Sequence, residues 1–279
     1  MKLSLRHILR SCAIVCAALA SWVSELAAAE EPQGTAAAIE LESKITVFGH
    51  TTVSNVAFES SDQDWTTISI GAAAKVSDDI QVSGDLQRED RTTEHNILVA
   101  SRLDVRFSNH TAIYIGGAAS FGAPLKENWS ISAGVSQQVA PGFWLTLDTR
   151  YAEYKATGPG RADFALAFVK VAPGIVIAPK GSRVELSAQI INLWNADGQI
   201  DYGWAARANY YLGDRNYVFV GASQYPETER GVTRRMTSAF AGLRHDLTAK
   251  LGFRVTFERS RLENSYVQSG VTFGLELKL

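Results

Sequence analysis

The sequence predicts an all-β fold, namely a transmembrane antiparallel β-barrel of about 14 strands. Apolar and polar side chains alternate along most of the chain, compact turn sequences alternate with longer charged connections, and aromatic residues gather near the expected strand ends. A count of about 12 to 16 strands is compatible with the same pattern. The mean hydropathy of −0.04 fits this class, because apolar outer positions and polar inner positions average out.

The N-terminus has the layout of a secretory signal peptide. Basic residues precede an apolar run at 12–23, and small residues follow at 27–29. The run is shorter than the roughly 20 apolar residues of a membrane helix. We therefore predict a signal peptide at 1–29, a short periplasmic segment at 30–42 and an outer-membrane β-barrel at 43–279. A lipid anchor is disfavoured, because Cys12 and Cys16 lie inside the apolar run and Val15, which is not small, precedes Cys16.

Cleavage after Ala29 removes both cysteines, so we expect the mature chain to have no disulfide, thiolate metal site or cysteine nucleophile. It also removes three of the 27 basic residues and one of the 29 acidic residues. The remaining charge is close to balanced, which argues against nucleic acid as a partner.

The strands are predicted from a period of two. In the segment 200–212, even positions such as Tyr202, Trp204 and Leu212 are apolar or aromatic, whereas odd positions such as Asp201 and Arg207 are polar or small. The same reading predicts strands that begin near Ser43, Asp64, Asp79, Glu94, Thr111, Asn128, Phe143, Ala162, Arg183, Gln199, Asn216, Thr233, Lys250 and Tyr266.

The connections indicate the orientation of the barrel, because bacterial barrels keep short turns on the periplasmic side and longer loops outside. The even connections are compact, as at 77–79, 108–110, 140–142, 212–215 and 245–248. The odd connections are mostly longer or more charged, as at 58–63, 88–93, 122–127, 154–161, 226–231 and 261–264. One even connection, 171–182, departs from the pattern because it contains Pro173 and Pro179; we interpret it as a bent strand end.

Aromatic residues near strand ends predict the two interfacial rings of a membrane barrel. A soluble β-sandwich also alternates, but export and an apolar face that reaches the last residue favour the membrane. The predicted interfacial residues are Trp65, Trp129, Phe143, Tyr151, Trp194, Tyr202, Tyr210, Tyr217 and Tyr266.

Charged residues on the opposite face are predicted to line the lumen, since an Arg or Lys on the lipid face near the midplane costs about 2–4 kcal/mol. Two interpretations remain open: a polar conduit, or a salt-bridged set of side chains that stiffens the barrel. The residues are Asp85, Arg102, Asp104, Arg106, Asp148, Arg150, Glu185, Arg207, Arg254 and Glu258.

Catalytic and metal chemistry are weakly supported. The histidines of the mature chain, His50, His95, His110 and His245, are scattered, and no Gly-x-Ser-x-Gly motif is present. His50 beside a serine is the best hydrolase candidate. Acidic pairs such as Asp62 with Asp64 lack ligand spacing, so we predict no metal and no cofactor.

Three stretches of the chain resemble the YaiO family of outer-membrane barrels: 129–135, 142–145 and 195–221. They include Trp129-Ser130-Ile131-Ser132-Ala133-Gly134-Val135 and Gly213-Asp214-Arg215-Asn216-Tyr217. The resemblance covers most of the chain from about Ile45 and rests on ordinary barrel-strand patterns. It implies an outer-membrane protein associated with surface polysaccharide systems and supplies no catalytic residues. Since only about a dozen residues separate the predicted cleavage site from the first predicted strand, we expect this chain to lack the helical repeats that precede the barrel in some members.

These observations lead to a function hypothesis with two alternatives. The first is a porin-like barrel or one associated with polysaccharide export and biofilm formation; the others are a lipid-modifying hydrolase and a structural surface barrel. The expected partners are outer-membrane lipid and lipopolysaccharide, the barrel-assembly machinery and, through the resemblance, polysaccharide biosynthesis or export proteins.

Overall fold

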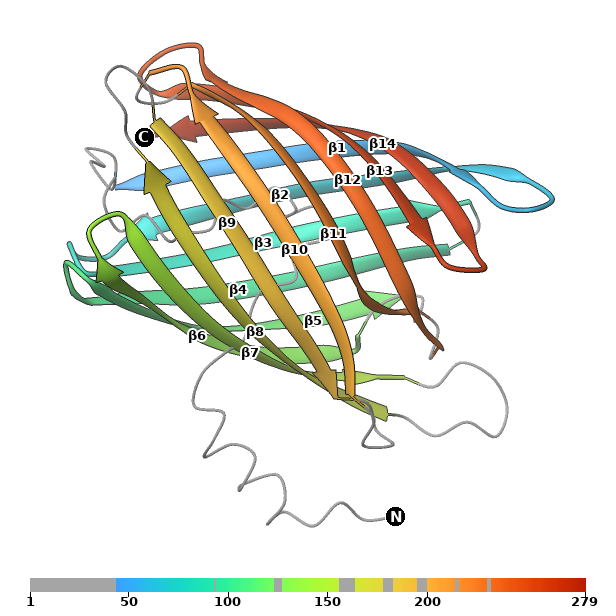
Figure 1. Cartoon of the computed structure of the whole chain (residues 1–279). Helices are drawn as coiled ribbons and strands as arrows, with labels where there is room; N and C mark the ends of the chain where they lie inside the picture. The colour runs from blue at the N-terminus through green and yellow to red at the C-terminus, as the bar shows by residue number, and fades with distance from the viewer. Residues whose placement is uncertain are drawn as a thin grey trace.

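The computed structural model describes residues 44–92, 94–122, 127–155, 164–177, 183–194, 200–213, 216–229 and 232–279. They form one closed antiparallel barrel, in which each strand pairs with its sequence neighbours and β1 pairs with β14 (Figure 1). The predicted fold class and strand number are confirmed. The strands are β1 (Ile45–Ala57), β2 (Asp62–Lys75), β3 (Ile80–Arg91), β4 (Glu94–Ser108), β5 (Thr111–Gly122), β6 (Trp129–Ala140), β7 (Phe143–Tyr154), β8 (Phe164–Ile177), β9 (Arg183–Trp194), β10 (Ile200–Tyr211), β11 (Tyr217–Glu229), β12 (Val232–Asp246), β13 (Leu251–Leu262) and β14 (Tyr266–Lys278).

All fourteen strands begin within two residues of the predicted positions, but several strands extend into the predicted connections. The connection predicted at 171–182 begins as strand, in agreement with its interpretation as a strand end, because β8 continues through Pro173 to Ile177. Pro173 is opposite Leu145 of β7, and on the β9 side the pairing resumes at Gly174, so the missing N–H interrupts one ladder without ending the strand. The predicted outer connections at 88–93 and 226–231 are mostly strand, because β3 extends to Arg91 and β11 extends to Glu229.

Both ends of the barrel sequence lie at the same end of the molecule, where the Leu279 N–H donates to the carbonyl of Ile45 (2.8 Å). Tight turns close the strands there, as where the Val76 N–H donates to the Ile80 carbonyl (2.9 Å). We call this the periplasmic end and the opposite one the extracellular end, following single-chain bacterial barrels. The predicted signal peptide at 1–29 and segment at 30–42 lie outside the described residues.

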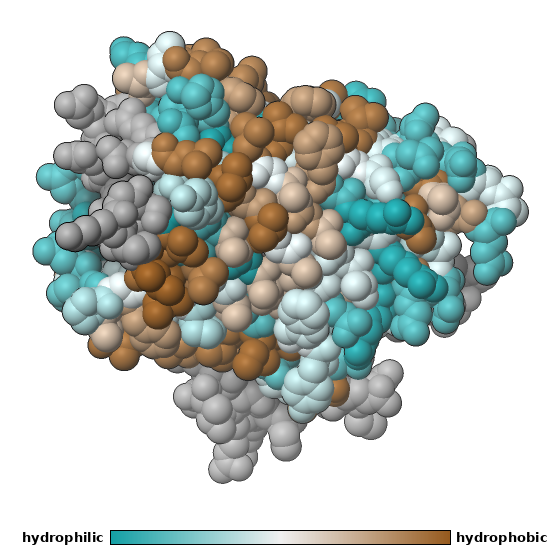
Figure 2. Space-filling model, turned by 45° about the horizontal axis from the view of Figure 1, so that its top comes forward, coloured by the Kyte–Doolittle hydropathy of each residue, from teal (hydrophilic) through white to brown (hydrophobic). Residues whose placement is uncertain are grey.

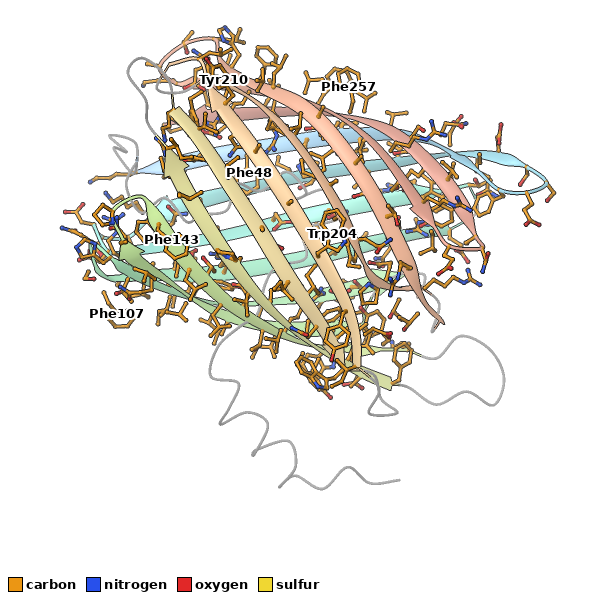
Figure 3. The ribbon with its side chains drawn as sticks, in the orientation of Figure 1. Phe48, Phe107, Phe143, Trp204, Tyr210 and Phe257 are labelled. Carbon is orange, nitrogen blue, oxygen red and sulfur yellow. The ribbon has the colours of Figure 1, made fainter. Side chains whose placement is uncertain are left out.

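Apolar side chains cover the outside of the barrel wall. Phe257 and Leu275 are 59% and 60% exposed, and Phe107 and Phe257 project away from the wall (Figure 3). Figure 2 shows hydrophobic side chains over the middle of the wall, with hydrophilic ones gathered toward one end. An apolar surface of this extent requires a hydrocarbon solvent. No helix among the described residues is long and apolar enough to cross a membrane.

Replacement of Ile70 by arginine tests this interpretation. Ile70 lies outward near the middle of β2 and is 59% exposed, whereas Thr66 is on the same face nearer the extracellular end. We expect Ile70→Arg to lower the free energy of unfolding in lipid vesicles by about 2–4 kcal/mol and Thr66→Arg by about 0–1 kcal/mol. Urea titration of the refolded barrel measures both; equal costs would contradict a hydrocarbon environment at Ile70.

Candidate functional site in the barrel interior

All ten charged residues that the sequence assigns to the lumen occupy inward-facing positions. Their neighbours along each strand are the exposed outer residues: Ser101 and Leu103 flank Arg102 in this way. The same parity continues across the ladders, where Asp148 is opposite Lys170 and Glu185 is opposite Asn209. The ten residues are Asp85, Arg102, Asp104, Arg106, Asp148, Arg150, Glu185, Arg207, Arg254 and Glu258.

One group of these charges lies on the wall formed by β4 to β7. The Arg102 guanidinium donates to both carboxylate oxygens of Asp104 (Nε at 3.0 Å from each) and lies over the ring of Tyr114, 3.8 Å from its centroid. The Tyr114 hydroxyl donates to Asp148 Oδ1 (2.9 Å). Paired in this way, charges of both signs remain inside without an isolated buried ion.

A second group lies on the wall from β9 to β13. The guanidinium carbons of Arg207 and Arg254 are 4.7 and 4.5 Å from the centroid of the Phe219 ring. Glu185 accepts hydrogen bonds from the Tyr211 hydroxyl (2.7 Å) and the Asn209 amide (3.3 Å). Two arginines therefore share one aromatic ring, and each gains a cation–π contact.

Glycines make room for the rings on which these arginines stack. Tyr114 is opposite Gly134, and a Cβ added to Gly134 would lie 2.4 Å from the Tyr114 ring. Phe219 is opposite Gly242, where the corresponding separation is also 2.4 Å. Each ring thus lies against the backbone of the adjacent strand. Two further pairs of this kind are Phe48 with Gly71 and Phe240 with Gly221.

The extracellular end of the interior holds two apolar clusters. The first joins β1, β2 and β12 to β14, and the second joins β7 to β9. In the first, Trp65 is 5.1 Å from the Tyr266 ring and lies under the Arg91 guanidinium at 4.0 Å. The first cluster contains Val56, Trp65, Met236, Leu262 and Tyr266; the second contains Ala152, Tyr154, Leu166 and Leu193.

Three aromatic residues that we expected at the membrane interface therefore face inward instead. Trp65, Tyr217 and Tyr266 are 7%, 2% and 7% exposed and have the parity of the inner face. Nearness to a strand end determines the height of a side chain along the barrel, whereas its odd or even position in the strand determines whether it faces inward or outward. The prediction used only nearness to the strand end. Six others face outward: Trp129, Phe143, Tyr151, Trp194, Tyr202 and Tyr210.

A buried ion pair links the outer connection before β6 to β7. The Arg150 guanidinium donates to Glu127, both side chains are 1% exposed, and Ser130 lies beside them. Sequence reasoning found Arg150 but missed Glu127, because Glu127 lies outside the alternating strand pattern. Breaking a buried pair leaves an uncompensated charge, so Glu127 holds this connection against the inner wall.

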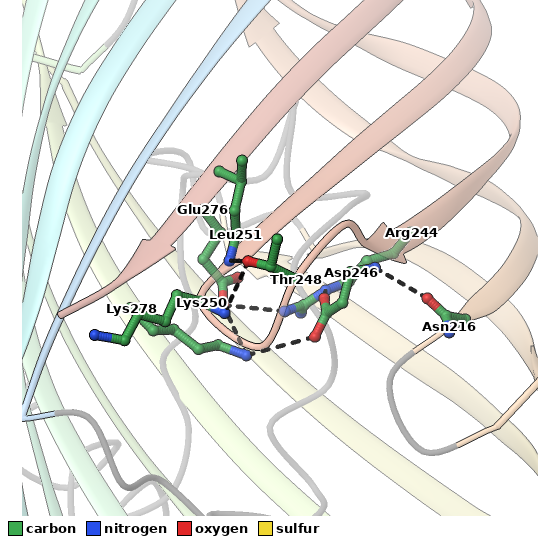
Figure 4. A network of polar contacts seen from close by, with 8 residues as sticks. All are labelled: Asn216, Arg244, Asp246, Thr248, Lys250, Leu251, Glu276 and Lys278. Atoms are coloured by element: carbon green, nitrogen blue, oxygen red, sulfur yellow. Dashed lines mark hydrogen bonds and ion pairs between the residues drawn. The ribbon is translucent and has the colours of Figure 1, made fainter.

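The periplasmic mouth carries an ionic network that the sequence reasoning did not single out (Figure 4). Arg244 donates to Glu276 (3.0 Å) and lies 3.8 Å from Asp246, while Lys278 contacts both carboxylates at 3.5 and 3.8 Å. The Asp246 N–H donates to the Asn216 amide oxygen (2.9 Å). The inward parity of these residues on β12 and β14 was available as a signal.

The hydrolase candidate, His50 beside a serine, is not joined by a hydrogen bond in the described residues. Ser69 is directly opposite His50 on β2, yet no hydrogen bond joins them and His50 Nε2 has no partner within the described part of the chain. His95 and His245 are exposed on other strands. Nor is there, in the ranges described, a group of three or more His, Cys, Asp or Glu side chains placed to hold a metal ion.

Comparison with known proteins gives the fold. No protein-family model and no curated protein matches the chain. Among solved structures it is similar to the CymD monoaromatic hydrocarbon channel, with a TM-score of 0.57, 9% identity and coverage of 86% of this chain and 90% of that one. It is also similar to the Acinetobacter baumannii outer membrane protein Omp33, with a TM-score of 0.51, 7% identity and coverage of 86% and 99%. The fold is that of outer membrane β-barrels.

Replacement of Gly134 by alanine tests the packing of rings on glycine. The new Cβ would meet the Tyr114 ring at 2.4 Å and Asp148 Oδ1 at 2.5 Å, so the ring must move and its hydrogen bond to Asp148 must weaken. We expect Gly134→Ala to lower the free energy of unfolding by about 1–3 kcal/mol. Gly174→Ala is the matched control, because its nearest neighbour is 3.8 Å away. Similar stability of the two variants in urea titrations would contradict the argument.

Proposed function

We propose that this chain is a porin-like barrel that lets small water-soluble solutes cross the outer membrane. The observation that carries the proposal is the arrangement of Arg102, Arg207 and Arg254. Their guanidinium groups stack on rings that lie against the wall, so aromatic bulk is kept at the wall and the charges face the interior. Polar, charged inner surfaces are typical of barrels that hold water.

Partial exposure of inward-facing groups supports a water-accessible path. The side chains of Arg102 and Asp104 are 25% and 24% exposed although they face inward, whereas Arg150 is 1% exposed. The inner face beside Arg102 is built from small residues, among them Ala100, Gly116 and Ser132. The proposed path therefore follows the inner surface of β3 to β6, away from the more tightly packed β7 to β9.

The chemistry of the interior favours hydrophilic solutes. The CymD structure is that of a monoaromatic hydrocarbon channel, and the two apolar clusters at the extracellular end of this chain resemble what an apolar solute requires. Charges of both signs follow them, however, including Asp85, Asp148 and Arg207. Removing water from such groups to admit an apolar solute costs free energy. The interior therefore favours solutes that leave these groups hydrated or form hydrogen bonds with them.

Charge reversal of Arg102 and Arg207 tests the proposal. We expect the double variant Arg102→Glu/Arg207→Glu, reconstituted in planar bilayers, to form channels whose reversal potential shifts toward cation selectivity, because two inward-facing cations become anions and the charge of the barrel interior changes by four units. Arg88→Glu is the control, since Arg88 is 62% exposed on the outside of β3. A wild-type barrel without discrete conductance steps, or an unchanged reversal potential in the double variant, would contradict the proposal.

A finer assignment, to surface polysaccharide export and biofilm formation, is supported by the resemblance to the YaiO family. Inward aromatic and carboxylate groups such as Tyr114, Tyr211 and Glu185 are of the kind that contact sugar hydroxyls. We expect proteoliposomes that contain the barrel to swell in isotonic oligosaccharide, and more slowly as chain length grows. Exclusion of every sugar while ions still pass would remove the polysaccharide assignment and leave the porin-like one.

A further inference from the structure

Three arginines form an outward-facing patch at the extracellular end of β12 and β13. Arg235, Arg259 and Arg261 are exposed, whereas the residues between and beside them, such as Ser260 and Leu262, are 5% and 1% exposed and face inward. The only other outward arginine on the described strands is Arg88. It is neutralised by Asp90, to which it donates three hydrogen bonds.

The register brings the three guanidinium groups within reach of one ligand. Arg259 and Arg261 project from the same face of β13, about 7 Å apart. Thr237 of β12 is directly opposite Arg261, so Arg235, two residues away on the same face, is its diagonal neighbour at about 7–8 Å. An arginine side chain is long enough to close these separations, and several guanidinium groups around one phosphate are a common anion site.

The surroundings of the patch leave space for a headgroup. The residues directly opposite Arg259 are Ala239 on one side and Ser269 on the other, both small. Gln224 orients the Arg235 guanidinium at the edge of the patch, because the Gln224 amide oxygen accepts a hydrogen bond from Arg235 (3.4 Å) and its amide nitrogen donates one to the Thr237 hydroxyl (3.3 Å).

Below the patch the same face becomes apolar. Phe257 is two residues below Arg259 and is 59% exposed, and Phe273 and Leu275 of the adjacent β14 are 58% and 60% exposed. A ligand that fits this face has phosphate at the height of the arginines and acyl chains at the height of the phenylalanines.

We propose that Arg235, Arg259 and Arg261 bind the phosphorylated headgroup of lipid A, the membrane anchor of lipopolysaccharide, with its acyl chains along Phe257 and Phe273. The charge supports this occupant: among the side chains that the structure describes, three cations on the outer face stand against the carboxylate of Glu263 in the following turn, whose N–H donates to the Arg235 carbonyl. The site is on the outer wall and goes beyond the proposed transport function.

Native mass spectrometry of the purified, detergent-solubilised barrel tests the proposal. The titrants are bisphosphorylated lipid A, the same lipid after removal of its phosphates, and phosphatidylethanolamine. We expect the wild type to prefer the phosphorylated lipid, and we expect Arg259→Gln/Arg261→Gln to raise its dissociation constant by about tenfold or more, since charge-assisted hydrogen bonds are lost. Heat-modifiable gel mobility and an unchanged channel conductance verify that the variant is folded.

Arg88→Gln is the matched control, because it removes an outward arginine on another strand that already has a carboxylate partner. We expect its affinity for lipid A to equal that of the wild type. Equal affinity of the double variant and the wild type, equal binding of the dephosphorylated lipid, or an equal loss in Arg88→Gln would overturn the proposal. Displacement of the lipid by millimolar inorganic phosphate would also overturn it, because the site would then be one for free phosphate.

Discussion

Backbone hydrogen bonding in a medium without water is the constraint on which the rest of this structure depends. Each exposed N–H or C=O group in hydrocarbon costs several kcal/mol, so a sheet can cross a membrane only if it closes. Here β1 pairs with β14 along nearly its whole length, from Thr46 to Ala57. Closure leaves no edge, and it also forces one face of every strand outward and the other inward.

On the inner face that closure creates, side chains pack in layers that consist of a glycine, an aromatic ring and a guanidinium group. Glycine on one strand admits an aromatic ring from its neighbour, and the ring supports an arginine: Gly134, Tyr114 and Arg102 form one such layer, and Gly242, Phe219 and Arg254 form another. Because the rings lie against the wall, charged groups approach the centre while their nonpolar surfaces remain covered. The same glycine–ring contacts therefore determine both how the interior packs and where its arginines lie.

The two ends of the barrel are stabilised by different interactions. Apolar clusters that include Trp65, Leu262 and Leu193 occupy the extracellular end, together with the buried pair of Arg150 and Glu127. The periplasmic end holds a network of ion pairs around Arg244 beside an aromatic cluster that includes Tyr211 and Tyr217.

The strand pattern predicted much of this arrangement. The period of two placed fourteen strands and the inward face of residues such as Arg102 and Arg207, because alternation is a local property of extended chain. The same parity was available for Trp65, Tyr217 and Tyr266 but was not applied to them, so their inward orientation was missed.

Which residues meet was decided only by the tertiary structure. Glu127 lies before β6 and contacts Arg150 of β7, and Arg235 adjoins Arg261 because the register of β12 and β13 places Thr237 opposite Arg261. The sequence by itself determined the fold class and the two faces of the sheet, since the polarity of each residue depends on whether its own side chain faces hydrocarbon or the barrel interior. Partners across the ladder depend on register and closure, which are properties of the whole barrel.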